Sequence, residues 1–68
     1  MNNRYHITVY KNNIEVIDTK LFRADSPNGI CVTFIGCGKN KAKLEANLTR
    51  VIAEYDVAPQ NVKYIKGF

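Results

Sequence analysis

The densest group of chemically useful side chains lies in GCGKNKAK, residues 36–43, which we call the basic corner. It follows an apolar run and opens a helical pattern, so its lysines crowd a helix start. Backbone N–H groups and the dipole at a helix start already favour an anion, and acidic side chains are the stabilising choice there. Three lysines at a helix start are better explained if a phosphate binds there. The residues predicted to contact nucleic acid or another anion are Lys39, Asn40, Lys41, Lys43 and Arg50.

Two glycines in the basic corner, Gly36 and Gly38, allow backbone amides to approach an anion, and Asn40 is the expected N-cap. The spacing does not match the G-x-x-x-x-G-K-[ST] loop, because too few residues separate the glycines and Asn40 follows Lys39. A nucleotide-hydrolysing loop is therefore not expected. Two interpretations remain, an anion-contacting corner and a solvated lysine cluster.

The other reactive side chains are too scattered to suggest catalysis. Cys37 lies among amides and lysines that favour a reactive thiolate, but no histidine or acid lies beside it in the sequence. His6 is the sole histidine, and one His with two distant Cys does not make a four-ligand zinc site. The six carboxylates form no pair that local spacing brings together for acid–base work. We expect no enzymatic activity, no cofactor and no metal site.

Cysteine spacing and the N-terminal sequence bear on the compartment. Cys31 and Cys37 are on the order of 20 Å apart along a strand at about 3.3 Å per residue, far beyond the roughly 7 Å Cα limit of a disulfide. We expect free thiols in a reducing compartment. The first residues lack the apolar run of a signal peptide, and no stretch approaches the roughly 20 apolar residues of a membrane span. A cytoplasmic protein without membrane contact is expected.

Length and charge limit the function classes. The 68 residues form one domain, residues 1–68, near the lower size at which a hydrophobic core alone holds a fold. Such a core leaves little room for a deep catalytic cleft. The formal net charge of +4 favours nucleic acid or an acidic protein surface as partner. The alternative is that the positive net charge serves solubility alone.

An amphipathic helix is predicted to follow the basic corner and to position it. Its apolar face consists of Leu44, Leu48, Val51, Ile52 and Tyr55, at helical spacing. Its polar face consists of Lys43, Glu45, Asn47, Arg50 and Glu54. Proline at position 59 disfavours helix in the residue before it, so the helix ends near Asp56. In so short a chain only a sheet can cover the apolar face.

Four segments are predicted to build that sheet: 4–11, a strand beginning after residues 12–13, 30–35 and 61–68. For the first hairpin we expect a three-residue loop that pairs Val9 with Ile17 and keeps Asp18 out of the core. The turn formers of residues 24–29 reverse the chain. The last strand should run in the direction of the third and lie at an edge. The predicted fold is α+β, two-layered, a four-stranded mainly antiparallel sheet with one helix on one face, in the order β-β-β-α-β.

The sheet offers a second candidate surface. His6, Thr8 and Tyr10 alternate away from Ile7 and Val9, and the expected register places them beside a mixed set, Val16, Asp18 and Lys20. An exposed aromatic on such a face can stack on a base or contact a protein, and an ordinary solvent-facing surface is the alternative. The segment 30–35 is apolar on both faces, which is typical of a strand inside a sheet and favours a homodimer through the sheet.

Two functions remain after these exclusions. The first is a small binding module that contacts nucleic acid, or a complex associated with it, through the basic corner. The alternative is a protein-interaction or inhibitor module that acts through its sheet face or edge strand, also as a dimer. In size and make-up the chain resembles small accessory proteins of phages and other mobile elements, without a shared motif. Nucleic-acid binding predicts steep salt dependence, and a protein complex should survive higher salt.

Overall fold

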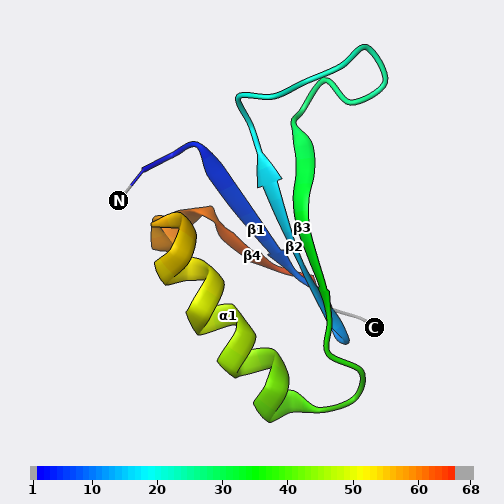
Figure 1. Cartoon of the computed structure of the whole chain (residues 1–68), viewed down its shortest axis with the longest axis vertical. Helices are drawn as coiled ribbons and strands as arrows, with labels where there is room; N and C mark the ends of the chain where they lie inside the picture. The colour runs from blue at the N-terminus through cyan, green and yellow to red at the C-terminus, as the bar shows by residue number, and fades with distance from the viewer. Residues whose placement is uncertain (1, 66–68) are drawn as a thin grey trace.

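The helix of this protein lies across one face of a four-stranded sheet and leaves the other face open (Figure 1). The computed structural model describes residues 2–65. The strands are β1 (Tyr5–Val9), β2 (Asn13–Asp18), β3 (Ile30–Gly36) and β4 (Val62–Tyr64). The helix α1 spans Lys41–Tyr55, and a short 3-10 turn, η1 (Pro59–Asn61), leads into β4. The predicted class and element order are confirmed.

The strands are arranged in the order β3-β2-β1-β4. β1 pairs antiparallel with β2, and β2 pairs antiparallel with β3. β4 pairs parallel with β1, with Ile7 opposite Val62. β4 therefore runs in the direction of β3 and lies at an edge, as predicted. The end of the predicted segment 61–68, residues 66–68, lies outside the described residues.

The expectation that the third strand lies inside the sheet is wrong. β3 forms the edge opposite β4 and pairs with β2 alone among the described strands. The helix covers one of its faces, where Thr33 and Ile35 are half-buried. On the other face Phe34 is 64% exposed. Its apolar sequence therefore does not reflect burial on both sides.

The predicted register of the first hairpin is also wrong. The turn has two residues, Lys11 and Asn12, and the Tyr10 N–H donates to the Asn13 carbonyl at 2.8 Å. Val9 then lies opposite Ile14. This register buries Ile14 completely. It also places Asp18 opposite Tyr5 on the helix-facing side of the sheet, where Asp18 is only 2% exposed.

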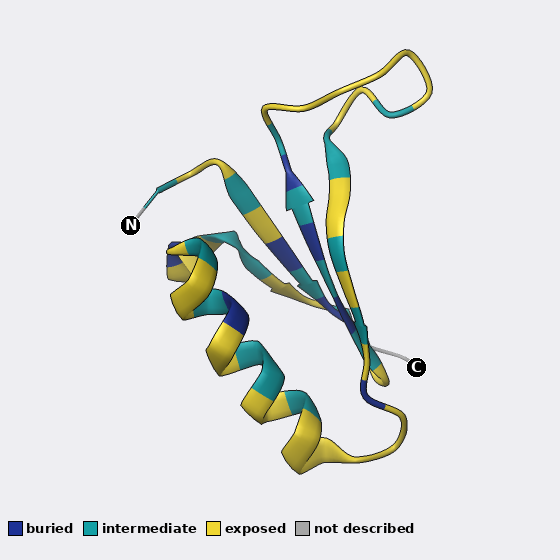
Figure 2. Ribbon diagram, viewed as in Figure 1, coloured by how far each residue is buried: buried dark blue, intermediate teal, exposed yellow. Residues whose placement is uncertain are grey.

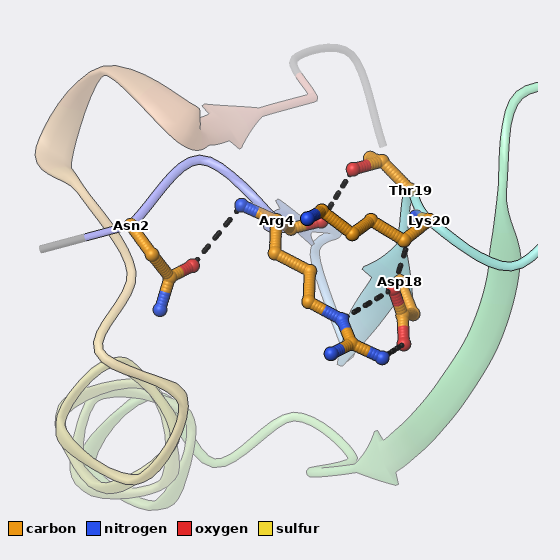
Figure 3. A network of polar contacts seen from close by, with 5 residues as sticks. All are labelled: Asn2, Arg4, Asp18, Thr19 and Lys20. Carbon is orange, nitrogen blue, oxygen red and sulfur yellow. Dashed lines mark hydrogen bonds and ion pairs between the residues drawn. The ribbon is translucent and has the colours of Figure 1, made fainter.

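Arg4 offsets the cost of burying the Asp18 carboxylate (Figure 3). Its guanidinium donates two hydrogen bonds, from Nε to Oδ1 at 3.0 Å and from Nη2 to Oδ2 at 2.8 Å. The backbone N–H of Lys20 adds a third, to Oδ1 at 3.0 Å. Such bidentate, charge-assisted pairing is the strong form of an ion pair. The expectation that Asp18 avoids the core was wrong because Arg4, in the segment before β1, pairs with its carboxylate.

The core lies between the sheet and the helix (Figure 2). Its buried members are Ile7, Val9, Ile14, Val16, Cys37, Val51 and Val57. The remaining apolar residues of the predicted helix face, Leu44, Leu48, Ile52 and Tyr55, are half-buried and pack against them. The predicted helix orientation is confirmed. The helix ends at Tyr55, and the C-cap residue Asp56, with a φ of 52°, takes the chain out of the helical conformation.

The Arg4–Asp18 pair predicts a pH dependence of folding stability. The hydrogen bonds from Arg4 hold the pKa of Asp18 below its ordinary value of 3.8, although burial opposes this. Because the folded pKa is depressed, the pair contributes its full stability above the unfolded pKa and loses it as pH falls through the folded pKa. We expect the melting temperature to fall steeply below about pH 4. Asp18→Asn should have a lower melting temperature than the wild type at neutral pH, and its melting temperature should fall less on acidification.

Thermal melts across this acid range, followed by circular dichroism, check the prediction. Asp25→Asn is the matched control, because the Asp25 side chain is 83% exposed and its contact with Arg23 is 3.9 Å long. This control should follow the wild-type curve. Parallel acid profiles for wild type and Asp18→Asn would contradict the assigned role.

Candidate anion-binding site

The basic corner packs against the β1–β2 hairpin. The backbone N–H of Cys37 donates to the Asn12 carbonyl at 2.7 Å and joins the two segments. This contact brings Lys11 of the hairpin to the same hollow as Lys39 and Lys41. The hollow has a volume of about 390 Å³ and is lined by Lys11, Asn12, Lys39, Lys41 and Leu44. Lysines from two distant parts of the sequence therefore surround one concave surface.

Local capping explains why the helix begins at Lys41. Gly38 takes a positive φ of 59°, and the Asn40 N–H donates to the Cys37 carbonyl at 3.3 Å. The Asn40 side chain then caps the helix, accepting from the Lys43 N–H at 3.0 Å. This confirms the predicted N-cap. The Asn40 carboxamide oxygen thus serves the helix cap.

Within residues 2–65, no acidic side chain pairs with the lysines of the hollow. The first turn of α1 contains no acidic residue. Within residues 2–65 the ion pairs are Arg4–Asp18, Arg23–Asp25 and Arg50–Glu54, so the lysines of the hollow have no acidic partner there. No carboxylate lines the hollow in that part of the chain. The helix dipole adds to this positive potential.

The structure separates the predicted anion-binding residues into two groups. Lys39 and Lys41 line the hollow, and Lys43 is exposed in the same turn. Arg50 lies more than two helical turns after Lys41 along α1, at about 3.6 residues per turn. Its guanidinium pairs with Glu54 at 3.2 Å and with Asn47 at 3.2 Å. Arg50 is therefore not part of the hollow.

Lys11 was not predicted from the sequence. Its place in a hairpin gave no sign of a site, because nothing in the local pattern indicates that this turn touches the basic corner. The single positive charge of Lys11 in the turn was the available signal. Only the tertiary contact between Asn12 and Cys37 makes that signal meaningful.

The predicted sheet-face residues lie on the open side, as alternation indicated. His6 is exposed, and Thr8 and Tyr10 are half-buried. Their neighbours on β2 are not the expected Val16, Asp18 and Lys20, because the register differs: His6 lies opposite Ile17 and Thr8 opposite Glu15. The Tyr10 hydroxyl donates to Glu15 Oε1 at 3.4 Å. This face is thus mixed in character, as predicted, but with other residues of β2.

Neither cysteine shows the features of a reactive thiol. Cys31 is exposed at the sheet edge, and partial burial together with the Glu15 carboxylate raises its thiol pKa above the ordinary value. Its thiol is therefore protonated at neutral pH. Cys37 is buried in the core, where Asn47 Nδ2 donates to its Sγ at 3.7 Å. The two cysteines are free thiols, as predicted.

Comparisons with known proteins identify no matching protein family, no matching curated protein and no matching solved structure. Within the described residues, no His, Cys, Asp and Glu side chains gather in a group of three or more that could hold a metal ion. The helix described here is neither long nor apolar enough to cross a membrane. The fold and the hollow define a small α+β domain with a concave basic surface.

Proposed function

We propose that this chain is a small, cytoplasmic, non-catalytic module that binds nucleic acid through the phosphates of its backbone. The observation that carries the proposal is the hollow at the basic corner, lined by Lys11, Lys39 and Lys41 without a carboxylate in the described part of the chain. Lysine binds phosphate as a flexible point charge and carries no base preference. Binding should therefore be tolerant of sequence.

The experiment is a fluorescence titration of short labelled DNA and RNA at several salt concentrations. Three phosphate contacts predict a slope of log K against log salt of roughly −3 on duplex DNA, at about −0.9 per contact. The slope on single strands should be shallower, at about −0.7 per contact. Replacing Lys11, Lys39 and Lys41 together by alanine should abolish measurable binding at moderate salt.

A variant with the same loss of charge is the matched control. Lys20, Arg23 and Lys63 are exposed and lie outside the hollow, so replacing all three by alanine removes three positive charges elsewhere. This control should keep most of its affinity. Equal losses in both variants would show that only net charge matters, and absence of binding at low salt would refute the proposal.

The open sheet face supports a second candidate function, protein interaction or inhibition. Phe34 lies on that face opposite Glu15 and is 64% exposed, and Val32 on the same strand is 41% exposed. Exposed apolar groups that gather on a surface mark interaction sites. A saturable protein complex that survives high salt and is lost in Phe34→Lys would favour this function over nucleic-acid binding.

A further inference from the structure

The outer edge of β3 is long and uncharged. Seven residues, ICVTFIG, form the strand, and none carries a charge. Edge strands in natural sheets are protected by short length, by lysine, by a β-bulge or by a covering segment. The opposite edge follows this rule, since β4 has three residues and an exposed Lys63. In the described part of the chain, β3 has one irregularity, a register shift against β2 between Val16 and Ile17, and no segment that covers its edge.

We propose that β3 pairs antiparallel with β3 of a second copy of this chain, centred on Thr33. Thr33 is the middle residue of Ile30–Gly36, so this register brings the largest part of the two strands side by side. Phe34 of one copy then lies opposite Val32 of the other on the open face. Aromatic and β-branched side chains form favourable cross-strand pairs. The two sheets join into one continuous sheet.

The uncharged edge of β3 permits a second copy as the occupant. Each copy has a net charge of +4, so association through a lysine-bearing surface would be repulsive. Pairing centred on Thr33 puts no charged residue of β3 against another. The basic corners follow Gly36 in each copy, and the two Gly36 residues lie on the order of 20 Å apart at about 3.3 Å per residue. That separation exceeds the Debye length of about 8 Å at physiological salt, so the repulsion between corners is screened.

This inference goes beyond nucleic-acid binding and does not depend on it. It narrows the protein-interaction alternative to one partner. Its experiment uses protein free of nucleic acid, so a failure to dimerise leaves the salt titration untouched, and the reverse also holds.

Sedimentation velocity from low to high micromolar protein tests the pairing. The wild type should shift from monomer to dimer as concentration rises. Phe34→Lys should remain monomeric, because it places a lysine of each copy beside the two-fold axis, while Glu15 opposite it on β2 accommodates the new charge within the monomer. Phe22→Lys is the matched control, since Phe22 is 71% exposed but lies in the β2–β3 connection. It should dimerise like the wild type.

A strictly monomeric wild type at high micromolar concentration would overturn the proposal. The same holds if Phe34→Lys dimerises normally or if Phe22→Lys alone prevents association. Circular dichroism establishes whether Phe34→Lys is folded. If it is not, hydrogen exchange of the wild type decides: protection of the β3 amides that grows with concentration supports the pairing, and protection elsewhere or none contradicts it.

Discussion

Ile7→Ala is expected to leave most of the protein unfolded at room temperature. Ile7 is completely buried at the centre of the core, on β1 between its partners Val16 on β2 and Val62 on β4. Truncating a buried isoleucine to alanine costs about 2 to 5 kcal/mol, which includes the cavity that remains. A core of this size supplies only about 3 to 5 kcal/mol of net stability. Urea unfolding followed by circular dichroism measures the loss.

Leu21→Ala is the control for this experiment. Leu21 is also a large aliphatic residue, but it is 45% exposed in the β2–β3 connection. Its replacement should change stability by no more than about 0.5 kcal/mol. If Ile7→Ala had the free energy of unfolding of the wild type while Leu21→Ala was largely unfolded, the assignment of the core would be wrong.

Gly29→Ala is expected to be nearly as damaging, for a different reason. Gly29 has a φ of 122°, a conformation that side chains rarely adopt. A Cβ at this position would come within 2.6 Å of Ile17 Cγ2 and 2.9 Å of the Asp18 carbonyl oxygen. Backbone strain of this kind alone costs about 1 to 3 kcal/mol, and the clash with a backbone oxygen adds to it. The free energy of unfolding, from urea titration, should fall by at least about 3 kcal/mol.

Two other glycines provide graded controls. Gly38 has a φ of 59° but open space around it, so alanine there should cost about 1 to 2 kcal/mol. Gly36 has no positive φ, and a Cβ added to it would meet no atom within 4 Å, so Gly36→Ala should be close to neutral. The expected order of destabilisation is Gly29, then Gly38, then Gly36. A larger effect at Gly36 than at Gly29 would contradict the conformation described for the β2–β3 connection.

Element type was predictable here because periodicity is a local property of the sequence. The helix face from Leu44 to Tyr55 and the alternation of β1 follow from residue spacing alone. The hairpin register could not be predicted from spacing, because two different turn lengths both place apolar residues of β1 opposite apolar residues of β2. Asp18 was the deciding residue, and its burial depends on Arg4, fourteen positions earlier. No local pattern in the sequence indicates that partnership.

The candidate site was predictable only in part, for a similar reason. Lys39 and Lys41 stood out because they cluster beside two glycines at a helix start. Lys11 joins them through a turn-to-loop contact that no local pattern encodes. The position of β3 in the sheet could not be predicted from a local pattern either. An apolar strand is compatible with an interior place and with an edge, and pairing of β1 with β4 decided between them.

The parallel pairing of β1 with β4 has a consequence for biosynthesis. β1 emerges from the ribosome about fifty residues before β4, and at about 5 to 20 residues per second this interval is roughly 3 to 10 s. During that time the antiparallel meander of β1, β2 and β3 can form, but the second edge of β1 has no strand beside it. Such transiently open edges are aggregation-prone. Translation speed after α1, and not only the final fold, should therefore influence how much of this protein is recovered in native form.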